Sequence, residues 1–567
     1  MSEPVCRPAP QAARAAWSLA GLAAAVALAG GCATAPPPPG LDTSPVRAQH
    51  GASAMAEGWH HGAFMEVFVR AYQDSDGDGI GDLRGLISRL DYLKDLGIKG
   101  LWLMPVTASA DRDHGYATTD FRAIERDYGS MADLDELLVQ AHARGIGVIM
   151  DYVINHAAAS HPMFVSARQD ARAPFRDWFV WSDDAPPGWD IWGQNPWYHT
   201  ASQPWEFKGP LKALPRPAAD AKGYYFGTFG PHMPDFNFRN PAVQSYHFDS
   251  LRFWLNRGLD GYRLDAVPHL IENNAKDWND QPESRRITKQ VQDLIKGYPQ
   301  RYVVCEATAK PTDYGDPQLC GGAFAFGYVD HFVKAAQGQP DSVKRLAEYY
   351  RTASPTMATF VSSHDIFAGK RLWDQVSGDL AQYKLSAAGY LLQPGTPFIY
   401  YGEEVGQAGV HSLQGDFPLR APMSWTADTA NAGFTTGQPF RPVSPNVATH
   451  NAQAQMQDPN GIHAFYKAML SLRNTLPSIA RGSFEHSFAE GLVLGFQRRW
   501  DQERTLVLIN YGTTEATASV PGLSPNMALR RLYPNAPLGR DGGAAPLPSS
   551  RVTVPPQSVQ VWRVLPG

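Results

Sequence analysis

The chain has few cysteines, no internal repeat and little net charge, and each of these absences excludes something. Only 4 of the 567 residues are cysteine, which is too few for a disulfide framework. The formal net charge of −5 gives no electrostatic reason to bind nucleic acid, so we expect no nucleic acid partner. With 43% hydrophobic and 19% charged residues, the composition is that of an ordinary globular protein, which we expect to be a monomer.

The N-terminus carries an apolar run at residues 15–29, preceded by two arginines. This run is too short to span a bilayer and has the form of a signal-peptide core. It leads to Cys32 through small residues, an arrangement similar to a bacterial lipobox with Leu28 one position early. We predict export, with residues 1–32 as a signal peptide and residues 33–57 as a Pro-rich tether. The protein is then either secreted or attached to the membrane of the cell envelope through a lipidated Cys32.

Two cysteines remain in the body of the chain, Cys305 and Cys320. One interpretation is a single disulfide between them. The interpretation that we favour is that Cys305 is a small, buried, apolar residue beside a strand.

The order of apolar patterns predicts an α/β fold. From about residue 66, short β-rich runs alternate with amphipathic helical stretches such as 83–96 and 131–144, which is typical of βα units with a parallel sheet. About eight units predict a (β/α)8 TIM barrel, whose chemistry lies at the carboxyl ends of the strands; an open doubly wound sheet is the alternative. The expected strands are 66–71, 100–106, 145–153, 261–267, 302–307, 322–326, 359–363 and 396–401.

Two segments break this alternation. The stretch 157–240 is much longer than a βα loop should be, and we interpret it as an inserted B domain. After the helix expected at 462–476, short strands and turns predict a C-terminal antiparallel β domain at 479–567. The barrel itself would then comprise residues 58–156 and 241–478.

The clearest chemical signal is the motif at 258–269, in which Arg263 and Asp265 follow an apolar strand. Two residues apart on a strand, they share one face. If that face is the barrel interior, the guanidinium holds the pKa of Asp265 low and keeps the carboxylate ionised, as a glycosidase nucleophile requires. A structural barrel salt bridge is the alternative interpretation.

Two further acids stand where strands should end. Glu306 follows an apolar run, and a carboxyl against an apolar wall has the raised pKa that a general acid needs. Asp365 ends the segment 359–365. Because burying acids is costly unless they are paired or functional, three such carboxyls together favour catalysis over structure.

A dense acidic turn lies at residues 74–82. Its beginning matches an EF-hand loop through Asp78 and the turn at Gly79, but Gly85 stands where the bidentate Glu would be. We therefore predict a structural Ca²⁺ loop outside the EF-hand fold; the alternative is a solvated acidic turn. The expected ligands are Asp74, Asp76, Asp78, Ile80 through its carbonyl, and Asp82.

These motifs, in this order, resemble the α-amylase family of glycoside hydrolases over about residues 68–484. The family is a (β/α)8 barrel with an inserted B domain and a C-terminal β domain. Two further segments, Met233-Pro-Asp-Phe-Asn237 and Arg420-Ala-Pro-Met-Ser-Trp425, resemble family motifs as well. The counterparts of four conserved regions are Asp151-Tyr-Val-Ile-Asn-His156, Gly261-Tyr-Arg-Leu-Asp265, Glu306 and His364-Asp365.

The resemblance implies a role for each matching position. Asp265 would be the nucleophile, Glu306 the general acid/base and Asp365 the carboxylate that grips the distorted sugar. Arg263 would orient Asp265. The implied substrate contacts are Asp113, Tyr116, His156, His269 and His364.

The predicted function is a retaining α-amylase that cleaves α-1,4 bonds of starch or maltooligosaccharides by double displacement. Ser363 and Pro268 depart from residues common in the family, which leaves the contacts on the leaving-group side open. The alternatives are an exo-acting α-glucosidase, a trehalose-forming transglucosidase and, in a different class, an inactive carbohydrate-binding relative.

Overall fold

The protein is described by a computed structural model that covers residues 40–111, 113–201, 223–524, 526–534, 545–546 and 550–565. The predicted signal peptide, Cys32 and the first part of the tether lie outside these residues. Within the part of the chain that is covered, no helix is both long and apolar enough to cross a membrane.

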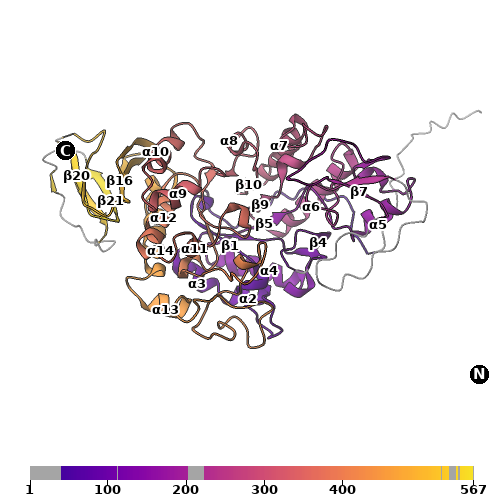
Figure 1. The fold of residues 1–567 in the computed structure, drawn as a ribbon, viewed down its shortest axis with the longest axis horizontal. Helices are drawn as coiled ribbons and strands as arrows, with labels where there is room; N and C mark the ends of the chain where they lie inside the picture. Colours follow the sequence, from indigo (N-terminus) through magenta and orange to yellow (C-terminus); the bar gives the residue numbers. More distant parts are fainter. Residues whose placement is uncertain are drawn as a thin grey trace, which may run out of the picture. The chain divides into compact units, whose positions relative to one another are not determined.

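Eight parallel strands form the central sheet (Figure 1). Their order is β12-β11-β10-β9-β5-β2-β1-β13, and a parallel bridge between Thr359 and Pro397 joins β12 to β13. The sheet therefore closes into the predicted barrel, and the open doubly wound alternative is wrong. The strands are β1 (Phe64–Val67), β2 (Gly100–Leu103), β5 (Gly147–Tyr152), β9 (Gly261–Leu264), β10 (Tyr302–Cys305), β11 (Ala323–Phe324), β12 (Met357–Ala358) and β13 (Phe398–Tyr400).

Helices follow the strands in the expected alternation. The stretch predicted as one helix at 83–96 is divided at Arg89, whereas the helix predicted at 131–144 forms as α4. Gly97 ends α3 in the left-handed conformation, with φ 106°, which glycine adopts without a Cβ penalty. The helices are α1 (Val69–Tyr72), α2 (Leu83–Ser88), α3 (Leu90–Leu96), α4 (Met131–Ala143), α6 (Pro241–Arg257), α7 (Pro282–Lys296), α8 (Pro311–Tyr314), α9 (Asp330–Ala336), α10 (Pro340–Glu348), α11 (Leu372–Gln375), α12 (Leu380–Leu392), α13 (Ala452–Gln457), α14 (Ile462–Thr475) and α15 (Pro477–Arg481).

Two smaller β structures leave the barrel at the carboxyl ends of β2 and β5. The first is a hairpin of β3 (Thr107–Ser109) and β4 (Thr118–Ile124). The second lies between β5 and α6 and contains α5 (Pro162–Gln169) and a sheet of β6 (Trp181–Ser182), β8 (Tyr224–Phe226) and β7 (Trp197–His199). An isolated bridge between His156 and Asp235 closes its base, so the long insertion begins and ends at the barrel rim.

The C-terminal part is the predicted antiparallel sheet. One face packs on α10, α12 and α15 and joins the barrel core, and the other carries a separate apolar cluster. The sheet order is β14 (Ser483–Glu490), β15 (Val493–Trp500), β16 (Glu503–Asn510), β21 (Ser558–Leu565), β18 (Ala528–Tyr533) and β19 (Ala545–Pro546), with β17 (Ala516–Ser519) paired to β20 (Arg551–Val554) beside it.

One sequence interpretation is wrong. Cys305 and Cys320 form a disulfide, with a Cα–Cα distance of 6.3 Å, whereas we favoured an unpaired Cys305. Cys305 is buried as expected, but topology places the loop that carries Cys320 beside the end of β10, which sequence spacing could not reveal.

The described part of the predicted tether lies along the barrel. Leu41 and Met55 are buried. The carbonyl of Ser44 accepts a hydrogen bond from Arg122, and the carbonyl of Arg47 accepts one from Asn256 on α6. These contacts hold residues 41–55 against the fold.

Candidate active site

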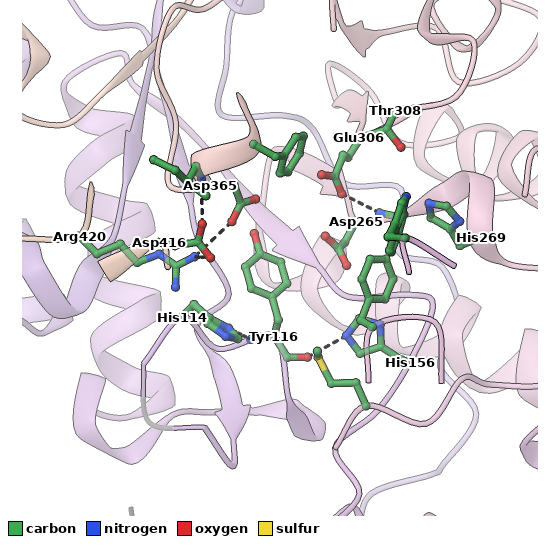
Figure 2. A pocket seen from close by; sticks show the side chains of 16 residues that line it. His114, Tyr116, His156, Asp265, His269, Glu306, Thr308, Asp365, Asp416 and Arg420 are labelled. Atoms are coloured by element: carbon green, nitrogen blue, oxygen red, sulfur yellow. Dashed lines mark hydrogen bonds and ion pairs between the residues drawn. The ribbon is translucent and has the colours of Figure 1, made fainter. Parts of the chain in front are cut away.

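A pocket of about 570 Å³ opens at the carboxyl ends of the barrel strands (Figure 2), the position where barrel enzymes carry their chemistry. The three predicted catalytic carboxyls share this pocket although their positions span 100 residues of chain. The lining residues are His114, Tyr116, His156, Trp192, Phe229, Met233, Asp265, Ala266, His269, Glu306, Thr308, Asp365, Ile366, Phe367, Asp416 and Arg420.

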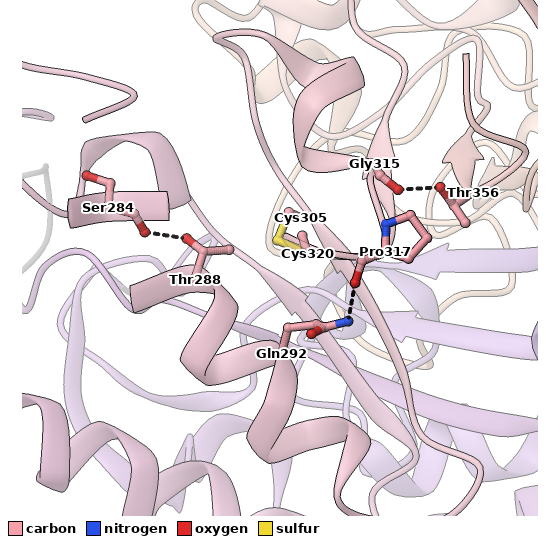
Figure 3. The surroundings of a disulfide bond; sticks show 8 residues. All are labelled: Ser284, Thr288, Gln292, Cys305, Gly315, Pro317, Cys320 and Thr356. Atoms are coloured by element: carbon pink, nitrogen blue, oxygen red, sulfur yellow. Dashed lines mark hydrogen bonds between the residues drawn. A yellow bond between two sulfur atoms is a disulfide. The ribbon is translucent and has the colours of Figure 1, made fainter. Parts of the chain in front are cut away.

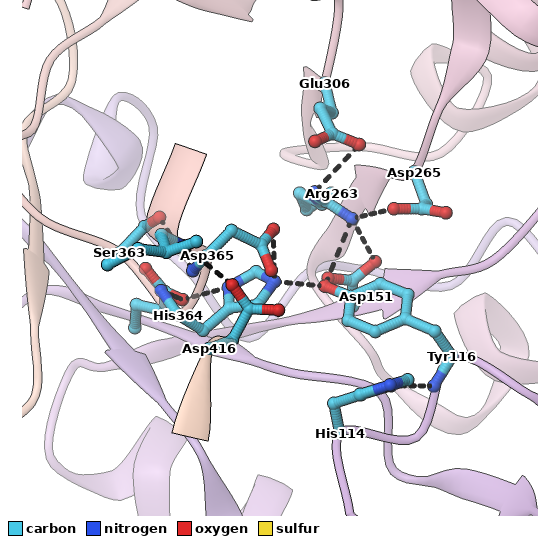
Figure 4. A network of polar contacts seen from close by, with 12 residues as sticks. His114, Tyr116, Asp151, Arg263, Asp265, Glu306, Ser363, His364, Asp365 and Asp416 are labelled. Carbon is cyan, nitrogen blue, oxygen red and sulfur yellow. Dashed lines mark hydrogen bonds and ion pairs between the residues drawn. The ribbon is translucent and has the colours of Figure 1, made fainter. Parts of the chain in front are cut away.

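Arg263 lies at the centre of the polar network beneath the pocket (Figure 4). Its Nη1 is 2.5 Å from Asp265 and 2.9 Å from Asp151, and its Nη2 is 3.0 Å from Glu306. All four groups are buried. One guanidinium therefore contacts three carboxyl groups and holds them in fixed positions, while its single charge is shared among them.

This shared charge overturns one prediction. We expected Arg263 to hold the pKa of Asp265 low, but burial and the neighbouring charge of Asp151 raise that pKa to about 6, against the opposing effect of Arg263. The sequence indicates that Arg263 and Asp265 lie close together. It does not show that Asp151 and Glu306 contact the same guanidinium. At neutral pH Asp265 is still mainly ionised.

Glu306 has the raised pKa that we expected of a carboxyl at this position. Burial, with the charges of Asp265 and Asp365, raises its pKa to about 7. Its Oε2 accepts a hydrogen bond from the backbone N–H of Ala266 at 3.1 Å. Ala266 has φ 50°, an uncommon conformation for a residue with a Cβ, and it aims this N–H at Glu306.

Asp365 is held in a different electrostatic setting. Its carboxylate is 3.0 Å from His364 and 3.1 Å from Arg420. Burial would raise its pKa, but these cations keep the pKa well below the usual range. Burial alone would lower the pKa of His364. The carboxylates of Asp365 and Glu66 instead raise it to about 10, and the Glu66 carboxylate lies 2.6 Å from the His364 ring. Asp365 is therefore ionised throughout the neutral range.

Arg420 lines the pocket next to Asp365. It is 2% exposed and lies 3.0 Å from Asp113 and 3.3 Å from Asp416. Asp113 also pairs with Arg441 at 2.7 Å, and it is not among the lining residues. The wall beyond Asp365 is thus a buried ion network, and Asp113 supports it.

The remaining predicted contacts surround the carboxyls. Tyr116, His156 and His269 line the pocket, whereas Arg263 and His364 line a smaller cavity that shares Glu306 and Asp365 with it. The Tyr116 hydroxyl donates to Asp151 at 2.8 Å. Burial lowers the pKa of His156 to about 3 and that of His269 to about 4, so both are neutral.

Sequence reasoning missed several residues of the pocket. Arg420 begins the motif at 420–425 and Trp192 lies in the inserted segment 157–240, but the sequence patterns assign neither residue to the site. Trp192 and Phe367 are large, exposed apolar residues. Their exposure marks them as candidate ligand contacts, and exposure is known only from the structure. The other lining residues without an earlier assignment are His114, Phe229, Met233, Ala266, Thr308, Ile366 and Asp416.

The acidic turn brings part of the predicted calcium set together. One carboxylate oxygen from each of Asp74, Asp76 and Asp78 lies within 4.8 Å of the others, and the Ile80 N–H donates to Asp78. Asp82 is not part of this group, because its side chain caps α2 by accepting from the Gly85 N–H at 2.7 Å. Three clustered carboxylates fit a hard divalent cation such as Ca²⁺.

A closed parallel barrel with buried acids of contrasting pKa in a pocket at its strand ends is the architecture of a barrel glycoside hydrolase. The family model described as "Alpha amylase, catalytic domain" matches residues 66–482. The chain therefore belongs to the α-amylase family of glycoside hydrolases and transglucosidases.

Individual relatives are similar over most of their length. The "Trehalose synthase/amylase TreS" of Mycobacterium tuberculosis is 34% identical over 472 residues, which cover 75% of this chain and 76% of that protein. The "Oligo-1,6-glucosidase" of Parageobacillus thermoglucosidasius is 28% identical, covering 82% and 92%. The structure of Bacillus licheniformis trehalose-6-phosphate hydrolase matches with a TM-score of 0.73 at 24% identity, covering 89% and 99%, and supports the fold.

Proposed function

We propose that the protein is a retaining, exo-acting α-glucosidase that removes terminal glucose from short α-glucosides. The observation that carries this proposal is the buried ion network of Arg420 and Asp113 next to Asp365. A buried ion network at this position supports a pocket that a sugar chain enters by its end, in place of an open groove along which the chain would lie. A pocket of about 570 Å³ is of the size that encloses a small ligand.

The reaction proceeds by double displacement. Asp265 attacks the anomeric carbon while Glu306 transfers its proton to the departing oxygen, which gives a glucosyl ester on Asp265 and a free alcohol. Glu306, now a carboxylate, then takes a proton from water, and the resulting hydroxide releases glucose and restores Asp265. Asp365 stabilises the positive charge that develops on the sugar ring.

The α-amylase prediction ranks below this proposal because an endo-acting enzyme needs space on both sides of the cleaved bond. A second candidate is a trehalose-forming transglucosidase, in which a sugar replaces water as acceptor. The similarity to the trehalose synthase/amylase of Mycobacterium tuberculosis supports it.

A product time course distinguishes these functions. Purified protein is incubated with soluble starch, with a maltose-to-maltoheptaose series and with trehalose. We expect glucose as the first product, released fastest from short substrates. Early mixed oligosaccharides from starch would restore the α-amylase prediction, trehalose formed from maltose would favour the transglucosidase, and no turnover would favour an inactive relative.

Two variants control this experiment. Asp265→Asn should abolish turnover. Asp260→Asn is the matched control, because Asp260 is also buried and lies at the opposite end of the same strand, where it accepts a hydrogen bond from the Val148 N–H. It should lower stability and retain activity.

We also propose a structural Ca²⁺ at Asp74, Asp76 and Asp78, and export of the protein. The clustered carboxylates support the calcium proposal. The apolar run at residues 15–29 and the Cys305–Cys320 bond support export, because disulfides persist mainly in oxidising compartments.

A further inference from the structure

The disulfide between Cys305 and Cys320 encloses the residue that we assign as acid/base. Cys305 is the last residue of β10, Glu306 follows it directly, and Thr308 lines the pocket. Cys320 lies at the far end of the same loop, just before β11. Figure 3 shows the bond joining the strand end to the returning loop. Both cysteines are fully buried.

The sheet holds this strand end unequally on its two sides. Toward β9, all four residues of β10 are paired, and the Glu306 N–H donates to the Leu264 carbonyl at 2.9 Å. Toward β11, the paired register contains only Cys305 and Ala323, because β11 is two residues long. The disulfide therefore adds a covalent tie on the weakly paired side, one residue before Glu306.

The Cys320 end of the loop is itself anchored. Gln292 on α7 donates to the Pro317 carbonyl at 3.2 Å, and Thr356 donates to the Gly315 carbonyl at 2.5 Å (Figure 3). The stretch nearer Glu306 carries a partly exposed ion pair, Asp313 with Arg285 at 2.8 Å, and exposed pairs contribute little. The disulfide connects the anchored end of the loop to the strand end.

We infer that the Cys305–Cys320 bond is a positioning device for Glu306, so that efficient protonation of the leaving group depends on it. The inference rests on the proposed function, because it requires Glu306 to be the proton donor. The cysteines act through Glu306 and do not touch the substrate.

The test compares two substrates that differ in their need for an acid. Cleavage of maltose releases a second glucose, whose departing oxygen must be protonated, whereas cleavage of α-glucosyl fluoride releases fluoride, which needs little protonation. In Cys320→Ala, which leaves Cys305 beside Glu306, kcat/KM for maltose should fall about 10- to 100-fold, as expected for a misplaced acid. The value for the fluoride should fall less than about 3-fold. Glu306→Gln should show the same selectivity more strongly.

Val304→Ala is the matched control. Val304 is a fully buried neighbour in the same strand, so its truncation weakens packing and leaves the bond intact. It should lower Tm without changing the ratio of the two kcat/KM values. The double variant Cys305→Ala/Cys320→Ala gives a second measurement should Cys320→Ala not fold.

Each outcome decides something different. A selective loss on maltose supports the inference. Equal losses on both substrates, or an unchanged ratio, overturn it while the proposed function stands. If the wild-type protein cleaves neither substrate, the proposed function falls and the inference falls with it.

Discussion

Arg263 illustrates how one residue sets the chemistry of its neighbours. It contacts Asp151, Asp265 and Glu306 at 2.5–3.0 Å, so its charge is divided among them. Burial is therefore the largest influence on the pKa of both reacting carboxyls, Asp265 and Glu306. Asp265, with a pKa near 6, must be ionised to attack, so kcat/KM should fall as the pH drops through about 6. Glu306, with a pKa near 7, must be protonated, so kcat/KM should fall as the pH rises through about 7.

The measurement is the pH dependence of kcat/KM for maltose, which should be bell-shaped and narrow. In Glu306→Gln, the residual activity on maltose should lose the alkaline limb and keep the acid limb. An alkaline limb that survives this substitution would show that another group carries the proton.

The sequence identified the residues within each motif, and it could not show the partners that lie across the fold. Arg420 meets Asp113 from a distance of 307 positions, and no local pattern encodes that contact. The same limit explains the error in the pKa of Asp265, because burial and the charge of Asp151, which comes from another strand, raise that pKa. Local motifs therefore identified the candidate site residues. The protonation states of these residues depend on partners that the barrel brings from other strands.

At the level of elements, patterns located the strands better than they located their ends. The run predicted as a strand at 66–71 is divided between β1 and the short helix α1, because periodicity cannot distinguish short, fully buried strands from helical turns. The strand predicted at 359–363 forms earlier, at Met357–Ala358. Residues 359–363 are still buried, and they carry the chain out of the ladder toward Asp365.

The acidic turn before α2 offers a test at the same scale. If Asp74, Asp76 and Asp78 bind Ca²⁺, adding calcium to chelator-treated protein should raise Tm by about 2–5 °C, since a ligand that binds only the native state stabilises it. Asp78→Asn should remove most of this shift, because it takes away one charge and keeps the oxygen that accepts from the Ile80 N–H at 2.8 Å.

Asp428→Asn is the control for this measurement. Asp428 makes the same local contact, accepting from the Ala430 N–H at 2.8 Å, and lies outside the acidic cluster. It should leave the calcium-dependent shift unchanged. A shift that survives Asp78→Asn at full size would place the cation elsewhere.

In the molecule as a whole, the C-terminal sheet and the barrel share one core. Arg498 on β15 is buried and donates to the Leu392 carbonyl at the end of α12, and Phe496 and Val507 belong to the same apolar cluster as the barrel helices. The domain boundary predicted at residue 479 therefore marks the change from barrel to antiparallel sheet. The apolar core continues across this boundary.

Export and the disulfide make a joint prediction about the whole chain. The protein with residues 1–32 should be recovered outside the bacterial cytoplasm with Cys305 and Cys320 joined, whereas a form that lacks these residues should stay inside with both thiols free. Alkylation followed by mass measurement reads the state of the pair, and the maltose-to-fluoride ratio of kcat/KM should be lower for the internal form. Cys320→Ala should give the same ratio in both compartments. Recovery of the form with residues 1–32 inside the cell, or of the bond in both forms, would contradict the link between export and the oxidised site.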